Sequence, residues 1–220
     1  MDNFELRKRQ EKVERSIASF LDKYFYSQPI FTDVHRCYNK EQQVKGTDIT
    51  ISIPSLGINK AVVDEKAAIT KVNCDLRTFS LELWRKDRRG VGGLGWLMSP
   101  DIITEYYLFQ WLKADVDDYL DINEYNITEI EVMLVPKRAI TDRLKEDGLT
   151  YNKVLEVIDL IKNGRGIEYL SSYKKEYWFY HSGHLVESPI NILMKKELYK
   201  KLAVIHQIIK RQDYGKDECG

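Results

Sequence analysis

The sequence predicts an α/β fold, and three observations lead to this class. An amphipathic helical pattern opens the chain, runs that alternate apolar and polar residues follow it, and two further helical segments precede the last strand-like runs. No internal repeat or low-complexity linker divides the chain. We therefore expect one domain over residues 1–220.

The first helix is expected from about Phe4 to Tyr26, because apolar residues recur there every three or four positions, and it should end near Pro29. The run Thr47–Ile53 alternates isoleucines with polar residues and predicts a strand with one buried face. After a turn, the β-branched run KAVVDEKAA predicts a second strand, and alternation in TFSLELW predicts a third.

The remaining elements are expected from similar patterns. Helices are predicted over Arg138–Glu146 and Tyr151–Lys162, because Asp-Gly and Asn-Gly pairs follow them. A basic helix is predicted from about Glu197 to Gln212. The glycine-rich segment RKDRRGVGGLGW should be a mobile loop, and TEYYLFQWLKA fits either a strand or a helix. Further strands are expected at ITEIEVMLVP, KKEYWFYH and PINILMKK.

Composition places the chain among soluble globular proteins, with 43% apolar and 31% charged residues. The 34 basic and 34 acidic residues balance, so net charge does not indicate a polyanionic partner. No apolar run is long enough to span a membrane, and the first residues lack the apolar segment of a signal peptide. We therefore expect a cytoplasmic protein without a membrane partner, whose three cysteines are reduced thiols.

Two acids and a lysine fall on two neighbouring predicted strands. Asp48 opens the first strand, whereas Asp64 and Lys66 lie on the second. A turn joins the strands, so they should pair antiparallel and bring the acids together. Alternate residues of a strand share a face, so Asp64 and Lys66 should point one way and Glu65 the other. Carboxylates are ligands that Mg²⁺ prefers, and a nearby lysine can hold an attacking water.

These residues resemble the PD-(D/E)xK nuclease superfamily. Over about residues 10–85 the chain has the order helix, Asp-bearing strand, D-x-K strand and third strand. The resemblance makes Asp48 the first acid, Asp64 the second and Lys66 the lysine. Gly46-Thr47 precedes Asp48 where the name-giving proline would stand, and members with Gly-x-Asp exist.

Further site residues follow from the resemblance alone. The middle residue of the D-x-K motif often lends its backbone carbonyl to the metal, so the metal ligands would be Asp48, Asp64 and Glu65. Many members also place a glutamate on the first helix, facing the site. Glu14 is the best match for that acid, and Glu41, just before the Asp48 strand, is a rival.

The resemblance implies a restriction-endonuclease-like core, in which helices flank a central mixed sheet. It also implies an enzyme that uses Mg²⁺ or Mn²⁺ to hydrolyse phosphodiester bonds in DNA, with a water near Lys66 attacking and the 3′ oxygen leaving. We expect an endonuclease of a restriction, repair, phage or mobile-element type. A homodimer would suit symmetric double-strand cleavage, whereas nicking needs one copy.

Substrate contacts are expected outside the acidic cluster. Gln43 precedes the Asp48 strand and could contact substrate, although an exposed glutamine needs no such role. The basic C-terminal helix is another expected contact with DNA. A basic cluster upstream of the glycines could meet phosphates, although charge runs are commonly ordinary solvated surface; it comprises Arg85, Lys86, Arg88 and Arg89.

Other interpretations remain open. A member of the same fold could bind nucleic acid or assemble with partners without catalysis, or Asp64 and Lys66 could simply pair in a protein with no nucleic-acid role. The segment Gly90–Gly95 matches GxGxxG, but no helix onset follows it, as a dinucleotide site would require. His181 and His184 lack a third nearby ligand for zinc.

Overall fold

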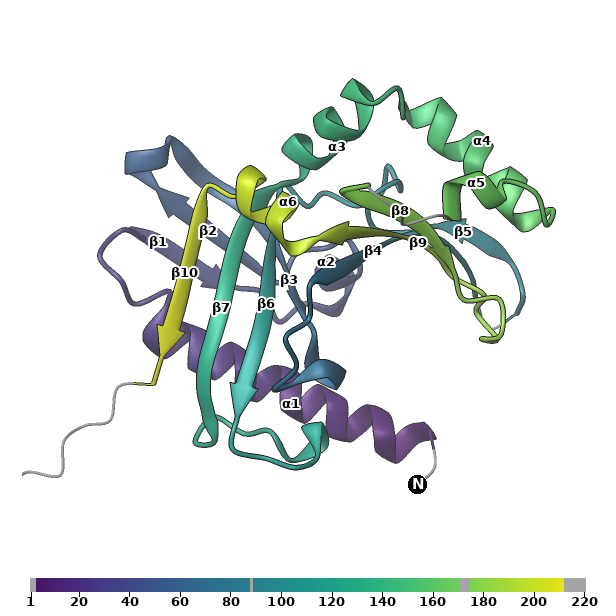
Figure 1. Ribbon diagram of the computed structural model, residues 1–220. Coiled ribbons are helices and arrows are strands. Elements are labelled where there is room, and N and C mark those ends of the chain that lie inside the picture. Colours follow the sequence, from purple (N-terminus) through teal and green to yellow (C-terminus); the bar gives the residue numbers. More distant parts are fainter. Residues whose placement is uncertain (1–2, 88, 171–174, 212–220) are drawn as a thin grey trace, which may run out of the picture.

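The computed structural model describes residues 3–87, 89–170 and 175–211, and within them it contains two β-sheets (Figure 1). The central sheet has six strands in the order β1-β2-β3-β6-β7-β10. Strands β3 and β6 are parallel and the other neighbours are antiparallel, so the sheet is mixed, as expected. Its strands are β1 (Asp33–Arg36), β2 (Ile49–Ile53), β3 (Ile58–Ala67), β6 (Tyr106–Ala114), β7 (Ile127–Pro136) and β10 (Ile205–Lys210).

The second sheet has four antiparallel strands in the order β5-β4-β9-β8. They are β4 (Thr78–Lys86), β5 (Gly92–Leu94), β8 (Tyr177–His181) and β9 (Ile190–Lys195). The helices are α1 (Asn3–Tyr24), α2 (Lys40–Val44), α3 (Lys137–Glu146), α4 (Tyr151–Lys162), α5 (Ile167–Leu170) and α6 (Lys196–Leu202). Single 3₁₀ turns lie at Pro54–Leu56, Ile69–Lys71 and Tyr119–Asp121.

Helix α1 covers one face of the central sheet, and Figure 1 shows it running across the strands. Its predicted apolar stripe, which includes Val13, Ile17 and Phe20, is buried in one cluster with Ile49 and Val63 of the sheet. Burial of this stripe is the main reason that the helix is stable, because helical propensity alone contributes little.

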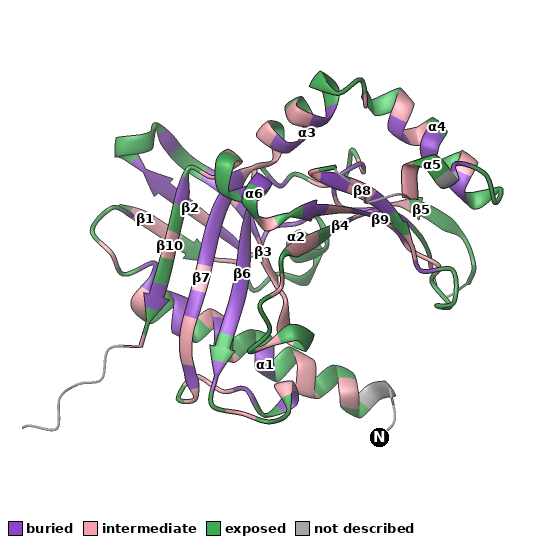
Figure 2. Ribbon diagram, in the orientation of Figure 1, coloured by how far each residue is buried: buried purple, intermediate pink, exposed green. Residues whose placement is uncertain are grey.

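The opposite face of the central sheet packs against the second sheet and the helices α3 and α4. Tyr107 and Phe109 of β6 are buried there with Leu81 of β4 and Ile158 of α4. Strand β6 is therefore buried on both faces (Figure 2). This double burial explains why its sequence, TEYYLFQWLKA, has no clean alternation and could not be distinguished from a helix.

Helices α3 and α4 confirm the predicted segments, α3 beginning one residue earlier than expected. Gly148 follows α3 with a φ of 81°, a left-handed conformation that glycine adopts without strain and that commonly ends a helix. Thr150 caps α4, because its hydroxyl accepts a hydrogen bond from the Lys153 amide.

The predicted closing helix is wrong in its second half. Helix α6 ends at Leu202, and Ile205–Lys210 forms β10 at the edge of the central sheet, paired with β7. Ile205 and Ile209 are four residues apart, so they share a face in a helix and in a strand alike. Both are buried in the cluster that α1 covers, which selects the strand. Gln212 lies outside the described residues.

The glycine-rich segment is not simply a loop either. Gly92–Leu94 forms β5, which pairs with the end of β4. A Cβ at Gly92 would lie 2.4 Å from a ring carbon of Trp84, so glycine allows this close packing. Strand β4 itself joins the second sheet, and the neighbour of β3 in the central sheet is β6.

Within the described ranges, no helix is both long and apolar enough to cross a lipid bilayer.

Candidate active site

The antiparallel hairpin of β2 and β3 brings Asp48 and Asp64 together. Ile49 is paired with Val63, so the preceding Asp48 lies opposite Asp64, and the Asp48 amide donates a hydrogen bond to the Val63 carbonyl at 3.0 Å. The carboxyl groups of Asp48 and Asp64 are near enough for each to influence the protonation of the other. The sequence prediction that these two strands pair antiparallel and bring the two acids together is therefore confirmed.

Lys66 shares the sheet face of Asp64. Its ammonium Nζ lies 2.7 Å from Asp64 Oδ1, and the two side chains are 16% and 4% exposed. Tyr107 on the adjacent β6 is fully buried beside Asp64. Two acids and an amine thus converge on the face of the central sheet that is turned toward the second sheet.

The contact between the acids changes their chemistry. Burial, the charge of Asp64 and the hydrogen bond with Asp64 raise the pKa of Asp48 to about 7, although the Glu65 amide and Lys66 act in the opposite direction. Two touching carboxyl groups need either a shared proton or a cation between them. The pair therefore fits a hard divalent cation that would replace the proton.

A cation at this pair would receive few protein ligands. In the part of the chain that the structure describes, no three His, Cys, Asp or Glu side chains are grouped so that they could hold a metal ion. Mg²⁺ typically binds one or two carboxylates and completes its shell with waters and substrate phosphate oxygens. Two carboxylates therefore suit Mg²⁺ better than they suit zinc, which takes three or four protein ligands.

Glu14 of α1 lies within electrostatic range of this pair. The residue is exposed at the surface, but its carboxyl group is partly desolvated by the protein atoms around it. This desolvation and the negative charges of Asp48 and Glu11 raise the pKa of the carboxyl group. Lys66 acts on it in the opposite direction. The rival Glu41 is exposed on α2, where its amide binds the capping side chain of Asn39. Between the two candidates, the electrostatic link to Asp48 favours Glu14.

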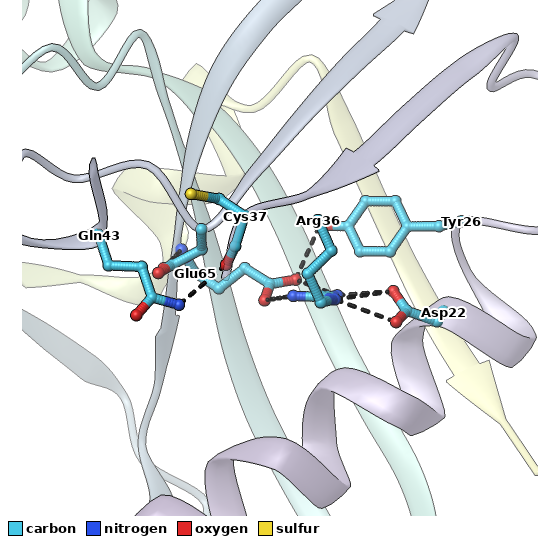
Figure 3. Close-up of polar contacts among 7 residues, drawn as sticks. Asp22, Tyr26, Arg36, Cys37, Gln43 and Glu65 are labelled. Carbon is cyan, nitrogen blue, oxygen red and sulfur yellow. Dashed lines mark hydrogen bonds and ion pairs between the residues drawn. The ribbon is translucent and has the colours of Figure 1, made fainter. Parts of the chain in front are cut away.

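Glu65 takes part through two separate groups. Its backbone amide donates a hydrogen bond to Asp48 Oδ2 at 2.7 Å. Its side chain points to the opposite face of the sheet, where Arg36 Nη1 lies 2.6 Å from Oε2 and the Tyr26 hydroxyl donates to Oε1 at 2.9 Å (Figure 3). Desolvation outweighs these partners and raises the pKa of Glu65.

Trp96 is a site residue that the sequence did not reveal. The Lys66 ammonium lies 3.7 Å from the centre of its ring, within the range of a cation–π interaction. The Tyr107 hydroxyl donates to the Trp96 carbonyl at 3.3 Å. The preceding Gly95 packs so closely on β4 that a Cβ there would lie 2.4 Å from the Glu82 carbonyl oxygen. The only available sequence signal was the position of Trp96 after the glycines.

Two more charged side chains approach from outside the β2–β3 hairpin. Lys137, the first residue of α3, donates to the Ile102 carbonyl at 3.3 Å, and burial lowers its pKa although Asp64 opposes this. Glu82 of β4 is mostly buried, and burial raises its pKa. Its Oε1 lies 3.5 Å from Arg85 Nε. The second sheet and α3 therefore border the acid pair.

Gly46 lies two residues before Asp48, where the backbone conformation and the packing both favour glycine. Its φ is 81°, a conformation that favours glycine, and a Cβ would lie only 2.1 Å from Thr104 Oγ1. The Thr104 hydroxyl donates to the Gly46 carbonyl at 2.8 Å. The backbone just before Asp48 is thereby fastened to the segment that leads into β6.

The described residues among the predicted substrate contacts lie on α2, at the end of β4 and just after it. Gln43 is exposed on α2, and its side-chain amide donates to the Cys37 carbonyl at 2.9 Å (Figure 3). Arg85 and Lys86 end β4. Arg89 pairs with Asp87 at 3.1 Å. Arg88 lies outside the described residues. Substrate binding by these residues stays a prediction.

No protein-family model matches this chain, and no curated protein matches it in sequence. Among solved structures, the chain is similar to the restriction endonuclease BglI bound to its DNA recognition sequence. The two chains are 12% identical, the match covers 90% of this chain and 70% of that one, and the TM-score is 0.38. At so low a TM-score, the likeness gives no information on which side chains act in this chain.

Proposed function

We propose that this protein is a metal-dependent deoxyribonuclease that uses Mg²⁺ or Mn²⁺, and that it acts as an endonuclease. The observation that carries the proposal is the convergence of Asp48, Asp64 and Lys66 on one face of the sheet, with the two carboxyl groups in contact. A pair of acids that shares a proton is costly to a fold, and a role in binding a cation accounts for it.

The metal ligands in this proposal are Asp48, Asp64 and the backbone carbonyl of Glu65. In an extended strand, the N–H and C=O of one residue point to the same side. The Glu65 amide points toward Asp48, and its carbonyl is therefore expected on that side as well. When bound, the cation supplies Lewis acidity that neutralises charge on the scissile phosphate.

Lys66 is the residue proposed to act on the nucleophile. Its ammonium donates to Asp64 and leaves hydrogens that can orient a water for attack on phosphorus. The attack forms a new P–O bond and breaks the bond to the 3′ oxygen, which leaves with the electron pair. The proton lost by the water passes to solvent, and the leaving oxygen takes a proton from solvent. Glu14 would add negative charge beside Asp48 and favour cation binding.

DNA as the substrate is supported by the family resemblance and by the basic residues at the end of β4. Arg85 and Lys86 carry positive charge beyond Glu82, on the strand that borders the site. Together with Arg88, Arg89 and Gln43 they are the proposed contacts to DNA, mainly to phosphates. A homodimer is proposed only for double-strand cleavage, since one copy suffices to nick.

A second candidate function is nucleic-acid binding or assembly without catalysis. The low exposure of Asp64, at 3%, favours it, because Lys66 already compensates that carboxylate in the absence of a cation. This candidate predicts DNA binding that does not require the acids.

Nicking of supercoiled plasmid DNA separates these candidates. The wild-type protein should nick with Mg²⁺ or Mn²⁺ and not with EDTA, and Asp64→Asn and Lys66→Met should abolish nicking while circular dichroism shows an unchanged fold. Lys113→Met is the control, because Lys113 also lies 2.7 Å from a carboxylate, that of Glu129, but near the end of β6, beyond the residues that pair with Asp64 and Lys66. DNA binding without nicking in the wild type would favour the second candidate.

A further inference from the structure

An ion network lies on the sheet face opposite the acid pair, with the Arg36–Glu65 pair buried and Asp22 exposed at its edge. Arg36 of β1 binds Glu65 through Nη1 at 2.6 Å and binds Asp22 of α1 through Nη2, also at 2.6 Å. The Tyr26 hydroxyl donates to the Glu65 carboxylate at 2.9 Å. Figure 3 shows the Arg36 guanidinium between the two carboxylates. The Arg36 and Glu65 side chains are 13% and 12% exposed, so this is an interior ion pair.

Stability alone is a poor explanation for such a network. Desolvation of buried charges often cancels their attraction, so apolar residues of similar size commonly stabilise as well or better. Position 65 follows Val63 on the same face of β3, and Val63 is fully buried in the cluster that α1 covers. An apolar side chain at position 65 would continue that cluster.

The network is joined to the acid pair by two backbone hydrogen bonds. The Glu65 amide donates to Asp48 Oδ2 at 2.7 Å, and the amide of Cys37, which follows Arg36, donates to the Asp48 carbonyl at 2.8 Å. Asp48 is thus held at its carboxylate by β3 and at its backbone by β1. Arg36 and Glu65 tie these two strands to each other across the start of β2.

We infer that Arg36 is a positioning residue for the proposed metal site, acting through Glu65 and Cys37 to hold the Asp48 carboxylate beside Asp64. The inference rests on the proposed function, since it assigns Asp48 to a cation. The bidentate fork of arginine spans the Asp22 and Glu65 carboxylates, and lysine cannot reproduce this geometry. Interactions that orient metal ligands commonly change metal affinity by about 10- to 100-fold.

The test measures cation affinity without DNA, by the loss of the free Mn²⁺ signal in electron paramagnetic resonance. Arg36→Lys, and the neutral pair Arg36→Met with Glu65→Gln, should weaken Mn²⁺ binding about tenfold or more. Nicking assays should show a matching rise in the Mg²⁺ concentration for half-maximal rate, with a smaller change in the rate at saturating Mg²⁺. If the double variant Arg36→Met with Glu65→Gln fails to fold, the Arg36→Lys variant alone tests the inference.

The matched control is another interior ion pair on the central sheet. Lys196 Nζ lies 2.5 Å from Glu131, and their side chains are 18% and 20% exposed, two strands away from β3. Lys196→Met with Glu131→Gln should leave Mn²⁺ affinity unchanged. If the control weakens Mn²⁺ binding as much as the Arg36 variants do, the effect is general destabilisation and the inference is wrong.

The remaining outcomes separate the inference from the proposed function. Wild-type affinity for Mn²⁺ in folded Arg36→Lys overturns the positioning role alone. A wild-type protein that binds Mn²⁺ but never nicks refutes the nuclease, while a tenfold loss in the Arg36 variants would still support positioning. A wild-type protein that neither binds Mn²⁺ nor nicks refutes both.

Discussion

The Lys66 ammonium lies between the Asp64 carboxylate and the face of the Trp96 ring, 2.7 Å from the first and 3.7 Å from the centre of the second. Asp64 belongs to β3 of the central sheet, whereas Trp96 lies in the segment that directly follows β5 of the second sheet. The position of the proposed catalytic amine therefore depends on how the second sheet packs. An amine held from two sides has fewer accessible rotamers and is better oriented toward a single water.

Substitution of Trp96 should lower activity without unfolding the protein. Cation–π contacts contribute about 0.5 to 2 kcal/mol, so Trp96→Leu should reduce kcat roughly 2- to 30-fold, with a smaller change in KM. Trp96→Phe keeps an aromatic face, so its kcat should lie between those of the wild type and Trp96→Leu. Single-turnover nicking rates at saturating DNA provide the measurement. Equal rates for the leucine and phenylalanine variants would show that the ring face does not matter.

Removal of the Asp48 charge should stabilise the protein at alkaline pH. The pKa of Asp48 is about 7 in the fold and 3.8 as an unperturbed group, so between these pH values the folded state keeps a proton that the unfolded state has lost. Stability from this group therefore falls as pH rises from about 4 to 7. Asp48→Asn has no carboxyl group to lose a proton at this position, so its stability should not fall in this way. It should be more stable than wild type at pH 8, by about 1 to 3 kcal/mol in the free energy of unfolding. Urea unfolding at pH 4 and pH 8 measures the difference, which should vanish at pH 4.

Mg²⁺ provides the control for this prediction. Because the proposed cation would bind the ionised pair, Mg²⁺ should raise the unfolding temperature of the wild type at pH 8 and have little effect on Asp48→Asn. An equal shift in both proteins would mean that Mg²⁺ binds elsewhere.

Alanine at Gly46 should damage the site more than alanine at another left-handed glycine. Gly57 has a φ of 67° and nothing within 4 Å of an added Cβ, so Gly57→Ala should cost only the conformational strain, about 1 to 2 kcal/mol. Gly46→Ala adds the clash with Thr104 Oγ1 and should cost more, and it should also reduce nicking because Asp48 is two residues away. Thr104→Ala should partly relieve the added cost. Chemical denaturation of the single and double variants measures this coupling, and the absence of relief would contradict the proposed clash.

The parts of the structure that could be predicted from sequence depend on local patterns. The apolar period of α1, the turn between β2 and β3 and the alternation that separates Asp64 from Glu65 are each encoded within a few residues. Strand β10 was missed because the spacing of Ile205 and Ile209 suits both a helix and a strand. The contacts of Arg36 with Glu65 and of Trp96 with Lys66 join segments distant in sequence, and no local pattern contains them.

Lys137 offers a last prediction, on DNA binding. It lies at the start of α3, its ammonium donates a hydrogen bond to the Ile102 carbonyl, and it is close enough to Asp64 for their charges to interact. In the proposed nuclease, a cation at this position would contact a phosphate next to the scissile one, so Lys137→Met should weaken DNA binding at low salt. It should also reduce the slope of log K against log salt by about 1, since one phosphate contact is lost.

Lys153→Met is the control, because Lys153 pairs with Glu156 on the exposed face of α4. Fluorescence anisotropy in Ca²⁺ or EDTA over a salt series measures both slopes, and an unchanged slope for Lys137→Met would remove this lysine from the DNA interface.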